Sequence, residues 1–100
     1  MMQQSGLHAP RVEVPVVIHD ELGLHARPAA RLAQAAQAFS ADVQILAEHG
    51  EADAKSILDI LSLAAGYGSR LTLVCSGEDA EAAAQTLRSL LESPLMRGGS

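Results

Sequence analysis

Alternation of hydrophobic and polar residues predicts β-strands in three parts of the chain. Successive side chains of a strand point to opposite faces, so alternation leaves one face apolar. A short fourth strand is expected after the second, through a tight turn at His49 and Gly50 in which the glycine would supply a positive φ. The predicted strands cover residues 12–18, 43–47, 51–54 and 70–76.

Three other segments repeat their apolar residues at helical spacing. The first spans residues 28–39, and Pro28 is expected at its start because proline needs no hydrogen bond in the first turn of a helix. The second begins at Ser56, with Asp59 three residues later in an approximate capping box, and is expected to end at residues 66–68. The third follows Gly77, and acidic side chains in its first turn would complement the helix dipole. These acids are Glu78, Asp79 and Glu81, and the apolar stripe of this helix runs to Leu91.

The order of the predicted elements is β-α-β-β-α-β-α. Each helix has one apolar face, which predicts an α/β (α+β) fold: an open-faced sandwich with three helices on one face of an antiparallel sheet. Pro15 cannot donate to a strand ladder, so the first strand is expected at a sheet edge or a bulge. A single domain over residues 12–92 is expected, with a disordered leader at 1–11 and a flexible tail at 93–100.

Composition narrows the possible partners and cofactors. Twelve acidic against seven basic residues give a net charge of -5, which argues against a nucleic-acid partner. Neither a metal nor a cofactor is expected, because the histidines lack metal-ligand spacing; His8, His19 and His49 are expected at the surface. The single cysteine, Cys75, is expected to be a small buried core residue in a reducing compartment. No apolar run approaches the roughly 20 residues of a membrane span, so a cytoplasmic location without membrane insertion is expected.

The strongest candidate for chemistry is the sequence Gly23-Leu24-His25-Ala26-Arg27-Pro28-Ala29. It places an imidazole directly ahead of a helix N-terminus. Unpaired N–H groups and the helix dipole favour an anion there, and Arg27 adds charged donors suited to phosphate oxygens. A nucleophilic imidazole next to an anion site indicates phosphoryl chemistry.

With the second motif Ala54-Lys55-Ser56-Ile57-Leu58, followed by Ser62-Leu63, the chain resembles a known family over residues 12–91. This is the histidine-containing phosphocarrier HPr family of the bacterial phosphoenolpyruvate-dependent sugar phosphotransferase system. The resemblance implies a monomer with sheet order 1-4-2-3. It also implies that Nδ1 of His25 accepts a phosphoryl group from enzyme I and passes it to sugar-specific IIA domains.

A carrier of this kind is a stoichiometric intermediate and not an autonomous enzyme. His25 is therefore expected to be exposed, with no general base for water beside it, and Arg27 to stabilise the phosphate. Ser56 is expected to cap its helix. The resemblance adds a second role for Ser56, regulatory phosphorylation by an HPr kinase/phosphorylase in some bacterial lineages.

Five apolar positions within residues 57–63 wrap too far around a helix for all of them to face inward. Some are expected to be exposed and to form, with residues of the preceding helix, a surface that binds partners. The alternative is that they complete the core. By resemblance, the candidates for this docking patch are Arg27, Ala30, Arg31, Ile57, Leu58 and Leu61.

The chain departs from the family at three positions where lysines are common: Gln34, Gln37 and Asp59. The basic rim is therefore thin, which affects the choice of partner more than the carrier chemistry. An alternative function is a regulatory module of the same fold, acting through Ser56 or in a nitrogen-linked branch of the system. A small histidine-dependent hydrolase is disfavoured, because no carboxylate is placed in the sequence to orient His25.

Overall fold

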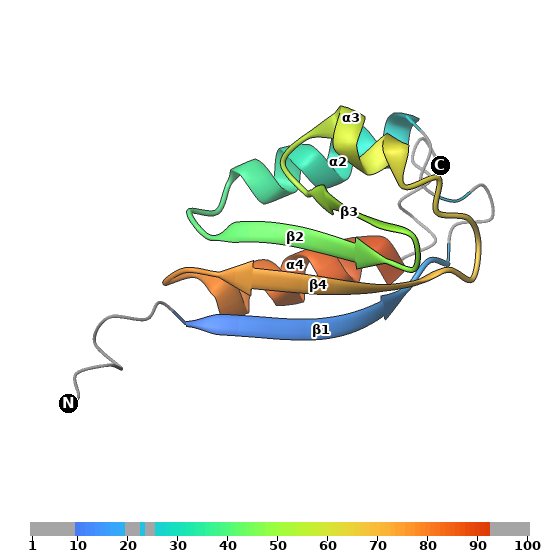
Figure 1. Ribbon diagram of the computed structural model, residues 1–100. Coiled ribbons are helices and arrows are strands. Elements are labelled where there is room, and N and C mark those ends of the chain that lie inside the picture. The colour runs from blue at the N-terminus through green and yellow to red at the C-terminus, as the bar shows by residue number, and fades with distance from the viewer. Residues whose placement is uncertain (1–9, 20–22, 24–25, 93–100) are drawn as a thin grey trace.

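The computed structural model describes residues 10–19, 23 and 26–92 and contains seven elements (Figure 1). The expected order β-α-β-β-α-β-α is confirmed. In chain order, the elements are β1 (Arg11–Val17), α2 (Ala26–Gln37), β2 (Asp42–Ala47), β3 (Gly50–Asp53), α3 (Ile57–Ser62), β4 (Arg70–Ser76) and α4 (Ala80–Glu92).

The four strands form one antiparallel sheet in the order β1-β4-β2-β3, as the family resemblance implied. The helices lie on one face of this sheet (Figure 1), which confirms the open-faced sandwich. Strand β1 pairs only with β4, so Pro15 lies on an edge strand, opposite Thr72. A proline destabilises an edge strand least, because such a strand is hydrogen-bonded to a neighbour on one side only. The position of the missing N–H can then face solvent.

The core lies between the sheet and the helices, and β4 is its centre. Leu71, Leu73 and Cys75 point into it from alternate positions and are 3% exposed or less. Burial raises the pKa of the Cys75 thiol, which keeps it protonated and unreactive, as expected of a core cysteine. Val74, on the opposite face, is also buried because its strand is flanked on both sides, by Glu13 and Gln44.

Two helix boundaries differ from the sequence prediction. Helix α2 begins at Ala26, so Pro28 is its third residue; the first turn still accepts proline because its N–H groups have no partner within the helix. Helix α3 ends at Ser62 and not at residues 66–68. Ala64 has a φ of 52°, in the left-handed region, and no helix continues through that conformation.

The prediction that Gly50 supplies a positive φ to the β2–β3 turn is wrong. The loop consists of Glu48 and His49, and Gly50 is the first residue of β3, paired with Ala47. Neither the loop residues Glu48 and His49 nor Gly50 has a positive φ. Pairing in the sheet holds Gly50 in a conformation open to any residue, so its place next to a turn misled the prediction.

Asp79 joins two parts of the fold that the sequence does not connect. It precedes α4, and its carboxylate accepts hydrogen bonds from the backbone N–H groups of Ser40 and Ala41, both at 2.8 Å. Of the three acids expected in the first turn of the last helix, only Glu81 lies there. The hydrogen bond from Ser40 is the main cause that lowers the pKa of Asp79, with further contributions from Ala41 and from Lys55.

Asp79→Asn is expected to lower the melting temperature at neutral pH, because the charged acceptor of two N–H groups is lost. A lowered pKa stabilises the folded state at pH values above the ordinary aspartate pKa of 3.8, and this contribution disappears as the pH falls through the folded pKa. Thermal unfolding from pH 7 to pH 2 should therefore show the two proteins converging below pH 3.8. Asp42→Asn, on the exposed start of β2, is the control; equal losses in both variants would contradict the role given to Asp79.

Candidate phosphoryl-transfer site

The N-terminus of α2 is the centre of the candidate site. The helix begins at Ala26, and the exposed Arg27 follows within its first turn. Pro28 and Ala29 are buried and hold this end of the helix on the core. His25 lies outside the described residues, so its expected exposure stays a prediction. Along the chain it directly precedes the first residue of α2.

The electrostatics of this helix end favour an anion. The first turn of α2 contains no acidic residue. Within the described part of the chain, no carboxylate forms an ion pair with Arg27 or Arg31. N–H groups of a helix first turn and a guanidinium are donors of the kind that bind a phosphate group.

Ser56 caps α3, as predicted. Its hydroxyl oxygen accepts a hydrogen bond from the N–H of Asp59 at 3.2 Å. The other half of a capping box is not formed, because the Asp59 carboxylate accepts from the N–H of Asp53 instead, at 3.2 Å. The N–H of Ser56 donates to the carbonyl oxygen of Asp53 at 3.0 Å. Asp53 and Asp59 therefore both hydrogen-bond to Ser56, Asp53 to its backbone N–H and Asp59 to its hydroxyl oxygen.

Lys55, the only lysine of the chain, lies just before α3 and forms hydrogen bonds to residues at the end of α2 and directly after it. Its Nζ donates to the carbonyl oxygen of Phe39 at 2.9 Å. In return, the side-chain amide of Gln37 donates to the carbonyl oxygen of Lys55 at 2.9 Å. The sequence carries no signal for either contact. Together they fix the position of α3 relative to α2.

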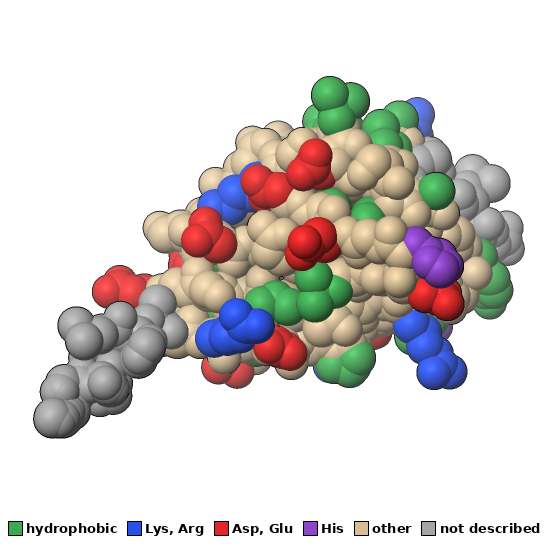
Figure 2. Space-filling model, in the orientation of Figure 1, with side chains coloured by type: hydrophobic (Ala, Val, Ile, Leu, Met, Phe, Trp, Pro, Cys, Tyr) green, Lys and Arg blue, Asp and Glu red, His purple; other side chains and the backbone are tan. Residues whose placement is uncertain are grey.

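Two large apolar side chains of α3 are exposed. Leu58 is 79% exposed and Ile57 is 40% exposed, whereas Ile60 is completely buried. Figure 2 shows apolar side chains protruding over α3. The expectation that some of these residues are exposed is confirmed, and the alternative that they all complete the core is wrong. Leu61 is half-buried and packs partly against the core.

On α2, Ala30 and Arg31 are exposed near Arg27, and α2 contacts α3. The structure therefore brings the six candidates together on two adjoining helices. Gln34, Gln37 and Asp59 are exposed as well. The positions where lysines are common in the family therefore present two amides and one carboxylate to solvent. In the described part of α2, Arg27 and Arg31 are the cations of this surface.

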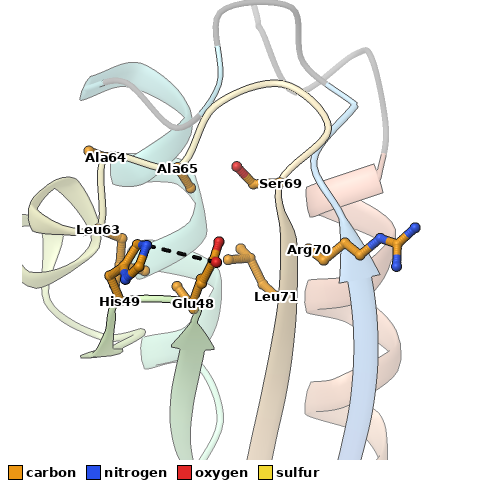
Figure 3. A pocket seen from close by; sticks show the side chains of 9 residues that line it. Glu48, His49, Leu63, Ala64, Ala65, Ser69, Arg70 and Leu71 are labelled. Carbon is orange, nitrogen blue, oxygen red and sulfur yellow. Dashed lines mark ion pairs between the residues drawn. The ribbon is translucent and has the colours of Figure 1, made fainter.

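A cavity of about 180 Å³ lies between the β2–β3 turn and the residues that precede β4 (Figure 3). It is smaller than the roughly 300–1,000 Å³ typical of ligand sites. Glu48 and His49 face each other at its rim, with 3.8 Å between Nε2 and the carboxylate, and Arg70 points away from it. His19 and His49 are exposed as expected, and His8 lies outside the described residues.

The described residues contain no group of three or more histidine, cysteine, aspartate or glutamate side chains able to hold a metal ion. Among their helices, none combines the length and the apolar character needed to cross a membrane.

Comparison with known proteins identifies the family. A family model described as "PTS HPr component phosphorylation site" matches residues 12–93. The chain is 35% identical over 83 residues to phosphocarrier protein HPr of Mycoplasma capricolum, an alignment that covers 82% of this chain and 93% of the relative. It is 39% identical over 83 residues to phosphocarrier protein NPr of Shewanella violacea, covering 83% and 91% of the two chains.

The solved structures agree with the sequence relatives. The crystal structure of a phosphocarrier protein HPr from Bacillus anthracis superimposes with a TM-score of 0.79 at 40% identity, covering 82% of this chain and 98% of that one. The fold, the matched residues and the relatives all point to one assignment. The chain belongs to the HPr family of phosphocarrier proteins of the phosphotransferase system.

Proposed function

We propose that this chain carries a phosphoryl group on His25, which it accepts from phosphorylated enzyme I and delivers to IIA domains of sugar permeases. One observation supports this most directly: the residue after His25 begins a helix whose first turn holds an exposed arginine and no acid. That arrangement stabilises a dianion directly next to the imidazole. The chain would act as a carrier, which needs a reversible acceptor and no turnover of its own.

The transfer exchanges one phosphorus–nitrogen bond for another. Nδ1 of neutral His25 attacks the phosphorus, the new bond forms on His25, and the electron pair of the broken bond returns to the ring nitrogen of the donor. The positive helix end favours both the neutral imidazole and the bound phosphate. Arg27 donates to the phosphate oxygens during the transfer. An exposed phosphate that is held by few groups can be passed on.

Docking of both partners is assigned to the patch of six residues on α2 and α3. Leu58 and Ile57 supply its apolar centre, and Arg27 and Arg31 supply its charge. Because the patch contains only two cations, we expect partners that rely on apolar contact with α3 more than on a strongly acidic surface.

Incubation with labelled phosphoenolpyruvate and enzyme I tests the proposal. The chain should take up one phosphoryl group that is labile in acid and stable in base, and peptide mapping should locate it at His25. Subsequent addition of a IIA domain should remove the label. A chain that takes up no label, or that holds it on another residue, would rule out the carrier function.

A regulatory module acting through Ser56 is the second candidate, and two observations favour it. The chain is 38% identical over 81 residues to the HPr-like protein Crh of Halalkalibacterium halodurans. The Ser56 hydroxyl also sits at the start of the exposed apolar helix, where a phosphate would alter the docking patch directly. Regulator binding that requires Ser56 but survives His25→Ala would support this candidate over the carrier. A nitrogen-linked branch is a further variant, suggested by the NPr relative.

A further inference from the structure

Gly23, two residues before His25, is packed tightly against the loop that joins α3 to β4 (residues 63–69, the α3–β4 loop). Gly23 is buried and has a φ of 74°. A Cβ atom at this position would lie 2.5 Å from the carbonyl oxygen of Ala65 and 2.8 Å from the Cα atom of Gly66. Both are backbone atoms, which cannot rotate away. Only glycine allows the two segments to approach this closely.

The same loop also holds the end of the β1 segment. The N–H of Ile18 donates to the carbonyl oxygen of Ser69 at 3.0 Å, and the N–H of Gly68 donates to the carbonyl oxygen of Ile18 at 2.8 Å. Ile18 is almost completely buried. The α3–β4 loop therefore contacts the chain on both sides of residues 19–22, at Ile18 by hydrogen bonds and at Gly23 by van der Waals contact.

Hydrogen bonds within the α3–β4 loop stabilise its conformation. Gly66 and Ser69 exchange two hydrogen bonds at 3.0 Å, from the N–H of Gly66 to Oγ of Ser69 and from the N–H of Ser69 to the carbonyl oxygen of Gly66. Ala64 keeps a left-handed φ, which is unfavourable for residues other than glycine. Such a conformation persists only where the surrounding contacts impose it. Figure 3 shows Ala64, Ala65 and Ser69 along this loop between α3 and β4.

We propose that Gly23 is a positioning residue for phosphoryl transfer, and that it acts by seating the segment before His25 on the α3–β4 loop. The proposal rests on the carrier function of His25. Two residues span at most about 7 Å, so a displacement of the Gly23 backbone is passed to the point from which the imidazole extends. A misplacement of about 1 Å at a reacting group can reduce a rate about 100-fold.

Gly23→Ala tests the proposal in the enzyme I assay. To bring the new Cβ atom to 3.0 Å from the Ala65 oxygen, the two segments must separate by about 0.5 Å or more. The kcat for phosphorylation of the folded protein is expected to fall at least about tenfold. The KM is expected to stay within about twofold, because the docking patch on α2 and α3 is unaltered. If the substitution affected stability alone, the melting temperature would fall and the kcat would stay at the wild-type value.

Two matched glycine variants serve as controls. Gly77→Ala places a Cβ atom 2.7 Å from Cα of Ala41, also at a positive φ, but it follows the far end of β4, on the order of 20 Å along the strand from the α3–β4 loop. It should lower stability and leave kcat unchanged. Gly66→Ala alters the loop itself at a position where no described atom lies within 4 Å of the new Cβ, and it should change neither.

The outcomes separate this proposal from the carrier function. If wild-type protein takes up no label, the carrier function fails. If wild-type is labelled and Gly23→Ala keeps a normal kcat, or if Gly77→Ala loses as much, the positioning role is overturned. If Gly23→Ala does not fold, Gly68→Ala replaces it. Gly68 has a φ of 83° and donates a hydrogen bond to Ile18, so an alanine there strains the loop backbone without creating a close contact. Its kcat should fall at least about threefold, and a normal kcat would overturn the role equally.

Discussion

His25→Ala is expected to abolish acid-labile labelling by phosphoenolpyruvate and enzyme I completely. The imidazole nitrogen is the only atom of the proposed site that can form the new phosphorus–nitrogen bond. In the proposed function, Arg27 and the N–H groups of α2 stabilise the phosphate but cannot accept it covalently. The loss should therefore be one of the reaction itself, with the melting temperature nearly unchanged, and labelling followed by gel separation measures it.

The controls are the two histidines that the described part of the chain contains. His19 and His49 are both exposed, so each could be phosphorylated if exposure of an imidazole were sufficient. His19→Ala and His49→Ala should take up the label as fast as the wild-type protein. Labelling that survives in His25→Ala would show that another residue is the acceptor.

Leu58→Ala is expected to raise the KM for enzyme I about tenfold without affecting stability. The side chain is 79% exposed, so its truncation removes little buried area from the folded chain. In a complex it would become buried at the centre of the docking patch, where a truncated anchor costs more than about 1 kcal/mol and 1.4 kcal/mol corresponds to a factor of ten. Steady-state phosphorylation at varied concentrations of the chain measures the KM.

Ile60→Ala, two residues further along the same helix, is the matched control, for which we expect a loss of stability and an unchanged KM. Ile60 is the only fully buried residue of α3, and its truncation should reduce the free energy of unfolding by about 2–5 kcal/mol. The KM of the molecules that remain folded should stay near the wild-type value. A normal KM in Leu58→Ala, with its side chain removed, would exclude α3 from the docking surface.

The periodicity of the sequence was sufficient to predict the type and order of the seven elements. Period-two and helical patterns reflect which face of an element is buried, and that information is local. Element ends were predicted less well. Glycine often takes a positive φ in a turn, which predicts Gly50 there, but pairing with Ala47 decides its conformation. The early end of α3 depends on the conformation of Ala64, an alanine in a region that usually requires glycine.

The candidate site divides in the same way. His25, Arg27 and Ser56 could be predicted because they stand in short motifs. The long-range contacts that support the fold and the site could not, because they join distant parts of the chain: Asp79 with Ser40, and Gly23 with Ala65. Neither Ser40 nor Ala65 differs in type from the other serines and alanines of the chain. Only the three-dimensional arrangement distinguishes them.

The position of β4 between β1 and β2 also determines when a newly made chain can complete its sheet. During synthesis β1 leaves the ribosome first, yet its only neighbour in the sheet is the sixth of the seven elements. The α3–β4 loop, which holds Ile18 and Gly23, emerges just before that neighbour. A nascent chain that ends before residue 63 therefore contains Ile18 and Gly23 without the loop that holds them. Under the proposed function, such an incomplete chain has His25 but lacks the contacts that seat the segment before it.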